Sequence, residues 1–121
     1  MKIGDIKFKA IRLDNGEWVE GDPVHNTTYV GIGYPSSVFP DVPVVHRVDP
    51  STVCMFTGLK DKNGTPIYEG DIVKYTDNIT EIIGNINWDS KTATFGFGCD
   101  FLYNFPSENM VVVGNKFDKE K

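Results

Sequence analysis

The chain lacks several features that would point directly to a class of protein. It has only two cysteines in 121 residues, so the disulfide framework of a small secreted protein is not indicated. No apolar run approaches the roughly 18 residues that a membrane-spanning helix needs, and the first residues, MKIGDIKFK, contain no apolar signal-peptide core. We therefore expect a soluble, intracellular protein in which Cys54 and Cys99 are free, buried thiols, with a disulfide between them left open.

An excess of basic charge is missing as well. The formal net charge is −5, with five basic and seven acidic side chains in residues 1–50 (−2) and seven and ten in residues 51–121 (−3). Non-specific binding to nucleic acid depends on clustered Lys and Arg, and neither half supplies such a cluster. An acidic balance of this size mainly favours solubility.

The usual signatures of catalysis, cofactor binding and metal ligation are also absent from the sequence. There is no glycine-rich phosphate loop and no nucleophile elbow around a serine. His25 and His46 have no cysteine or carboxylate at a metal-ligand spacing, so they are expected to be exposed or to lie at an interface. We expect no catalytic residue, no cofactor and no metal, although a site built from residues distant in sequence stays open.

Turn residues and strand formers are abundant. Twelve Gly and seven Pro are spread among Val, Ile, Thr and Phe, a composition typical of short strands and tight turns. Alternating apolar residues predict strands at 6–11, 17–20 and 28–32, and five or six more after residue 51, at the spacing of a small barrel or sandwich. One core is predicted to bury Ile72, Ile82, Ile86, Trp88, Phe95 and Phe97.

The most ordered stretch is TGLKDKNGTPIYEGDIVKY, Thr57 to Tyr75. Gly64 and Gly70 stand in two turn signals, and we predict a positive φ at both. The acidic residues could form a carboxylate cluster for metal or acid–base chemistry. Because each stands beside a turn glycine, we favour a structural role, in which Asp61 and Asp71 accept backbone hydrogen bonds and Glu69 lies on the surface.

This stretch resembles the hallmark of the YopX-like family of small phage and prophage proteins. The similarity covers Thr57–Gly64 and Ile67–Val73, with weaker similarity at Lys7–Ala10, Val48–Val53 and Val113–Asn115. Residues 23–47 show no similarity, and Lys116-Phe117-Asp118 replaces the usual polar ending. The resemblance implies a mostly β fold with an SH3-like barrel and a gene carried by a phage or prophage, hence the cytoplasm of a bacterial host. It implies no established biochemical activity.

We therefore expect a single YopX-like domain over residues 1–121. Its expected parts are an N-terminal hairpin lobe with a proline-rich loop (1–50), an SH3-like barrel region (51–116) and a tail (117–121).

The proline-rich segment from Gly33 to Arg47 is the candidate protein-contact loop. Its prolines interrupt regular structure, yet it is rich in apolar side chains. The candidate contact residues are Tyr34, Val38, Phe39, Val42 and Val44, with Val45 beside them. Such side chains either cover a sheet edge within the monomer or form an exposed interface, and the sequence leaves both open.

The sequence thus favours a small non-enzymatic accessory protein that binds another protein or a second copy of itself. The alternative is a nucleic-acid-binding accessory of phage replication or regulation. Its basis is a run of aromatic residues that could stack on bases: Phe95, Phe97, Phe101, Tyr103 and Phe105. Core packing is the preferred interpretation of that run, because Asp100 and Lys91 provide no net positive charge beside it.

Overall fold

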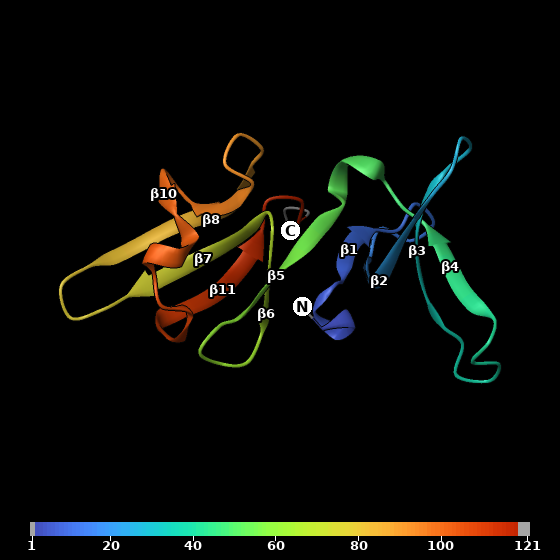
Figure 1. Cartoon of the computed structure of the whole chain (residues 1–121), viewed down its shortest axis with the longest axis horizontal. Helices are drawn as coiled ribbons and strands as arrows, with labels where there is room; N and C mark the ends of the chain where they lie inside the picture. The colour runs from blue at the N-terminus through green and yellow to red at the C-terminus, as the bar shows by residue number, and fades with distance from the viewer. Residues whose placement is uncertain (1, 119–121) are drawn as a thin grey trace. The chain divides into compact units, whose positions relative to one another are not determined.

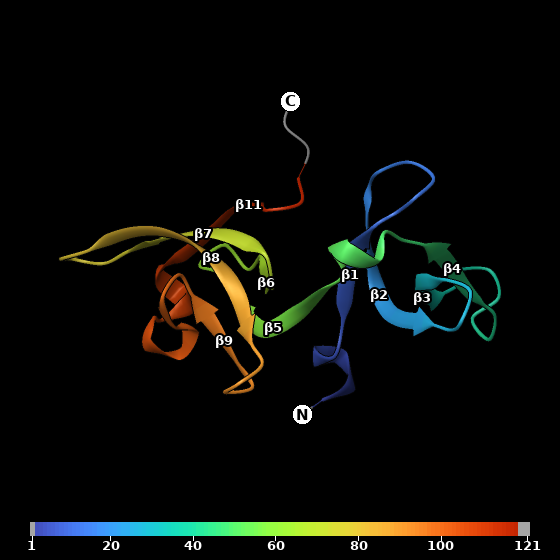
Figure 2. The same cartoon turned by 90° about the horizontal axis from the view of Figure 1, so that it is seen from above.

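The computed structural model describes residues 2–118, and within them the protein is mostly β, as predicted. The chain divides into two compact units, Met1–Phe56 and Thr57–Lys121, called unit 1 and unit 2 below (Figure 1, Figure 2). Among the described residues, no helix is long and apolar enough to cross a membrane. Residues 119–121 of the predicted tail lie outside the described residues.

Unit 1 is an antiparallel sheet of short strands. Its strand order is β4-β3-β2-β1, with the start of β5 beside β1. The strands are β1 (Phe8–Ile11), β2 (Trp18–His25), β3 (Val30–Pro35), β4 (Pro43–Arg47) and β5 (Cys54–Lys60), and the short 3-10 turns are η1 (Ile3–Asp5) and η2 (Pro50–Thr52). Ala10, Ile32 and Val48 form its buried core.

Pro23, Pro35 and Pro43 lie inside strands, whereas Pro40 and Pro50 do not. The prediction of a long irregular loop from Gly33 to Pro50 is therefore wrong for residues 33–35 and 43–47. Facing residue pairs alternate along an antiparallel ladder. The two residues of one pair exchange backbone hydrogen bonds, and those of the next pair direct their N–H and C=O groups away from the partner strand. The bonds from Ser36 N–H to Val42 O (3.3 Å) and from Val48 N–H to Val30 O (3.0 Å) set this alternation for β3 and β4. Pro43 and Pro35 therefore direct their nitrogens away from the β3–β4 ladder, where no donor is required.

Pro23 follows the same rule. The sequence predicted a strand that ends before Gly21, but β2 continues through Pro23 to His25. Asn26 N–H donates to Tyr29 O (3.1 Å), so the alternation turns the backbone groups of Pro23 away from β3. On that other side, the pairing of β2 with β1 has already ended at Gly21. The strand can continue through the proline because no hydrogen bond is lost.

Unit 2 contains the remaining strands in a five-stranded antiparallel sheet of order β10-β9-β8-β7-β11, with β6 outside it. The bounds are β6 (Pro66–Tyr68), β7 (Asp71–Thr76), β8 (Glu81–Asp89), β9 (Thr94–Phe97), β10 (Asp100–Phe101) and β11 (Met110–Asn115), with η3 (Leu102–Asn104) and η4 (Ser107–Asn109) between the last two strands. Within the described residues the sheet is open, with β10 and β11 at its edges, so no closed barrel is formed and the SH3-like detail is not confirmed.

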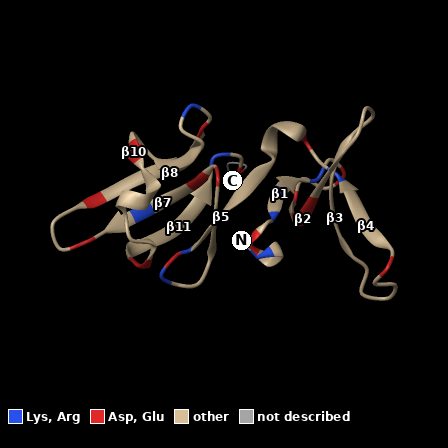
Figure 3. Ribbon diagram, viewed as in Figure 1, with Lys and Arg blue, Asp and Glu red and all other residues tan. Residues whose placement is uncertain are grey.

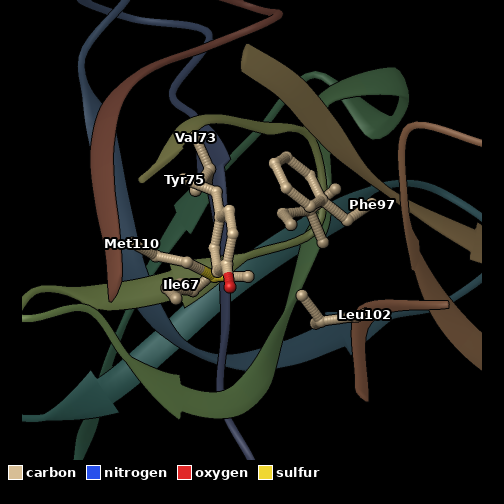
Figure 4. Close-up of a cluster of buried hydrophobic side chains, with 7 residues drawn as sticks. Ile67, Val73, Tyr75, Phe97, Leu102 and Met110 are labelled. Atoms are coloured by element: carbon tan, nitrogen blue, oxygen red, sulfur yellow. The ribbon is translucent and has the colours of Figure 1, made fainter. Parts of the chain in front are cut away.

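The core of unit 2 gathers side chains from most of these strands and from η3. Figure 4 shows the buried cluster, which consists of Ile67, Val73, Tyr75, Ile86, Phe97, Leu102 and Met110. Ile82 and Phe95 pack against it, half-buried. The prediction that Ile86 and Phe97 are core residues is thereby confirmed.

Two of the predicted core residues lie elsewhere. Ile72 is half-buried and shares a face with Lys74, because the buried carboxylate of Asp71 sets the phase that turns Val73 and Tyr75 inward. Trp88 is 42% exposed near the end of β8, where its ring meets Phe95 edge-on at 5.1 Å. Both predictions of full burial are wrong.

Candidate functional site

The candidate site is the β3–β4 hairpin of unit 1, which comprises β3, the loop of residues 36–42 and β4. The two strands pair in register from Gly31 opposite Arg47 to Pro35 opposite Pro43. Only residues 36–42 are irregular, so most of the proposed contact loop is ordered sheet rather than loop. The tip is consequently held at a fixed place on a paired scaffold.

Local hydrogen bonds hold the tip of the hairpin. The hydroxyl of Ser36 accepts from the backbone N–H groups of Val38 (3.2 Å) and Phe39 (3.1 Å). Val42 N–H in turn donates to Phe39 O at 2.9 Å. The tip is a compact turn stabilised by a serine side chain, a common function of that residue at loop starts.

The apolar side chains of the tip point to solvent. Val38 is 72% exposed, Phe39 66% and Val42 58%. These three residues form what we call the apolar tip. They do not fold back over the sheet edge within the described structure, so they remain available for contact.

The other two predicted contact residues lie on the strands beneath the apolar tip. Tyr34 and Val44 face each other across the ladder, and Tyr34 is 38% exposed whereas Val44 is half-buried. The Tyr34 hydroxyl lies 2.9 Å from Nε2 of His46, and their rings are 5.6 Å apart. His46 therefore orients Tyr34, a partnership that the sequence did not reveal.

The free edge of β4 offers little backbone for strand addition. The alternation described above turns the backbone groups of Pro43, Val45 and Arg47 toward this edge. Pro43 has no N–H to donate, and the carbonyl of Arg47 already accepts from Leu13 N–H at 3.0 Å. A partner would therefore contact the hairpin mainly through side chains.

A shallow hollow of about 250 Å³ lies beside the apolar tip. It is lined by Asp22, Val24, Gly33, Tyr34, Pro35, Pro40 and Pro43. Asp22 and Val24 were missed as site residues because β2 was expected to end before them. If β2 is continued through Pro23, Asp22 and Val24 are two residues apart and lie on the same face of the strand. This spacing is the signal in the sequence that could have identified them.

The acidic residues of the Thr57–Tyr75 stretch have structural roles. Asp61 is 6% exposed, and its carboxylate accepts the N–H groups of Asn63 (2.8 Å), Thr65 (2.9 Å) and Val112 (2.9 Å). Burial opposes ionisation of this carboxyl, but the three donors outweigh it, so the pKa of Asp61 lies below its usual value. The predicted turn cap is confirmed.

Asp71 accepts a backbone hydrogen bond across the Gly70 corner, as predicted, and also a bond from a side chain. Its fully buried carboxylate accepts the N–H of Tyr68 (2.8 Å) and the side-chain amide of Asn115 (2.9 Å).

Gly64 and Gly70 have φ values of 81° and 85°, which confirms the prediction for both turns. Within residues 2–118, no group of three or more His, Cys, Asp or Glu side chains is placed to hold a metal ion.

The aromatic run divides between core and surface. Phe97 is buried, and the ring of Phe105 meets it edge-on at 5.0 Å. Phe101 and Tyr103 are exposed and stacked, with ring centroids 5.2 Å apart. Cys99, in the turn before them, is exposed rather than buried as predicted, because it follows Gly98 at a tight corner with a φ of 61°.

Comparison with known proteins agrees with the resemblance noted in the sequence. None of the curated proteins compared with the chain matches it. The family model described as "YopX protein" matches residues 7–120, which is nearly the whole chain. The match includes both the stretch around Asp61 and the β3–β4 hairpin. The chain therefore belongs to the YopX family.

Proposed function

We propose that this protein is a non-enzymatic accessory protein of a phage or prophage, located in the bacterial cytoplasm, that binds another protein through the β3–β4 hairpin. The observation that carries the proposal is the exposure of three large apolar side chains, Val38, Phe39 and Val42, on an ordered turn. Exposed apolar side chains grouped on one turn are candidates for a protein contact, because exposed apolar patches often mark interaction sites.

The order of the hairpin supports the same function. Pro35 and Pro43 restrict the backbone on either side of the loop of residues 36–42, and Pro40 restricts it within the loop. Ser36 bonds to the turn that carries the apolar tip. A segment that is already ordered loses less conformational entropy when it binds. The apolar tip could therefore contribute to affinity with little further ordering.

A non-enzymatic role is supported by the use of the acidic residues. The carboxylates that might have formed a catalytic cluster, Asp61 and Asp71, accept hydrogen bonds from the backbone and from Asn115. Carboxylates committed in this way stabilise turns and are poorly suited to exchanging protons with a substrate.

The test is capture of protein partners from lysate of phage-infected host cells. We compare the wild type with a Val38→Ser/Phe39→Ser variant, and Tyr103→Ser, which removes another exposed aromatic ring, is the matched control. Wild type and control should retain the same protein, with and without nuclease, and the tip variant should lose it at an unchanged melting temperature. Identical capture by all three would contradict the proposal.

The nucleic-acid alternative has one observation in its favour, the exposed stacked pair of Phe101 and Tyr103. Aromatic pairs can stack on single-stranded bases when a cationic groove holds the backbone. Here the adjacent ionisable residue is Asp100, whose carboxylate accepts from Phe101 N–H (2.7 Å) and from the Asn104 amide (2.8 Å). The local charge therefore disfavours a phosphate backbone, and protein binding remains the preferred function.

A further inference from the structure

The hollow beside the apolar tip combines an apolar surface with a single ionisable wall. Val24 and the three prolines, Pro35, Pro40 and Pro43, supply the apolar part, and Gly33 and Tyr34 complete the lining. Asp22 is the one charged residue among those that line it. The hollow volume of about 250 Å³ is large enough for one long side chain, but too small for a folded element.

The carboxylate of Asp22 has no cationic partner within the described residues. The nearby cations on the same sheet are engaged elsewhere. Lys7 pairs with Glu20 at 3.4 Å, Lys9 lies 4.5 Å from the centre of the Trp18 ring, and Arg47 lies 4.7 Å from that of Tyr29. Asp22 therefore presents a carboxylate at the wall of an apolar hollow and forms no ion pair there within the described residues.

The chemistry of this hollow selects among possible occupants. A purely apolar side chain would remove water from the Asp22 carboxylate and give nothing in return, which is unfavourable for a charged group. A Lys or Arg side chain places its aliphatic stem against the prolines and Val24 while its charged end reaches the carboxylate.

We infer that the hollow binds a Lys or Arg side chain of the protein partner, and that this residue lies next to the apolar residues that contact the tip. The inference rests on the proposed function, because it assumes that the β3–β4 hairpin is the binding surface. It adds the chemistry of the partner: a basic residue within an apolar segment.

The experiment uses a random-sequence peptide library displayed on yeast, selected against the full chain. Selected peptides are then titrated against the wild type and against Asp22→Asn. The matched control is Asp41→Asn, which removes the same charge from residues 36–42 without lining the hollow. We expect Lys or Arg to be enriched at one position, and Asp22→Asn to weaken binding by about threefold or more while Asp41→Asn changes it less.

Amide chemical-shift changes, followed for every bound peptide, separate failure of the inference from failure of the proposed function. If peptides shift the apolar tip but show no basic preference, or bind Asp22→Asn as tightly as wild type, the inference is wrong and the proposed function stands. If Asp41→Asn weakens binding as much as Asp22→Asn, general attraction explains the effect and the inference is also wrong. If no selected peptide shifts the hairpin, both fail.

Discussion

Single carboxylates in this protein each accept hydrogen bonds from several backbone N–H groups. The Asp61 side chain joins its own turn to the edge strand β11, and Asp77 does similar work in the turn between β7 and β8 by accepting from Ile79 (2.8 Å) and Thr80 (2.7 Å). Asp77 also accepts from the Tyr75 hydroxyl at 2.9 Å, and these bonds lower the pKa of Asp77. Asp61 and Asp71, two of the acidic residues of the family hallmark, thus have identifiable roles in the fold.

Replacement of Asp61 should show this role directly. Asp61→Asn removes the charge and turns an amide toward backbone donors, so we expect a loss of about 2–4 kcal/mol in the free energy of unfolding at pH 7. Urea denaturation measures the loss, and Asp5→Asn, at an exposed position, is the control. An effect equal to that of the control would show that the three hydrogen bonds contribute nothing.

The same substitution predicts a dependence on pH. Because the pKa of Asp61 is lower in the folded state, the ionised carboxylate stabilises the fold above the unfolded value of about 3.9, and this stability disappears as the pH falls through the folded value. The stability difference between wild type and Asp61→Asn should therefore shrink on acidification. A difference that stays constant from pH 7 to about pH 3 would rule out the linkage.

At the scale of strands, alternation of apolar residues predicted elements well where the chain is free of proline. Strands β7, β8, β9 and β11 all lie after residue 51, where five or six strands were predicted. The prolines led to wrong strand boundaries, because the sequence does not show in which direction a proline nitrogen points. The nitrogen of Pro23 points away from the β2–β3 ladder and that of Pro43 away from the β3–β4 ladder, so neither strand loses a hydrogen bond. The same error hid Asp22 and Val24, so the hollow could not be predicted. Exposure of the apolar tip was one of the two arrangements that the sequence left open.

The second limit on prediction from the sequence is which side chains of a strand face the core. Substitution of a buried and an exposed aromatic residue can measure the difference. Phe97→Ala should cost about 3–5 kcal/mol, because its buried ring contacts the centre of the unit 2 core. Trp88→Ala should cost only about 1–2 kcal/mol, since the side chain is 42% exposed and loses mainly its edge-on contact with Phe95. Denaturant midpoints compare the two variants, and equal losses would place Trp88 in the core after all.

At the scale of the molecule, acidic and basic side chains are interspersed. Figure 3 shows Lys and Arg scattered among Asp and Glu in the described residues rather than collected along one strand. Some of the cations are paired, such as Arg12, which donates to both carboxylate oxygens of Asp14. A net charge of −5 with this scattered distribution disfavours attraction of a phosphate backbone.

We therefore expect no binding to random duplex DNA at about 150 mM salt, with a dissociation constant weaker than about 100 μM. Fluorescence anisotropy with a labelled duplex measures it, and a titration at low salt serves as the sensitivity control. A micromolar constant at the higher salt would favour the nucleic-acid alternative.

The bond between Asp61 and Val112 also bears on how the protein is made. Val112 lies 51 residues downstream of its acceptor, and the core residue Met110 lies just before it. During translation, the hydrogen bond from Val112 N–H to the Asp61 carboxylate can form only after residue 112 has left the ribosome. Strands β1 to β4 lie entirely before residue 57, so they can pair while the ribosome is still adding unit 2. A polypeptide released before residue 110 would lack the edge strand β11 and would leave the centre of unit 2 open to water.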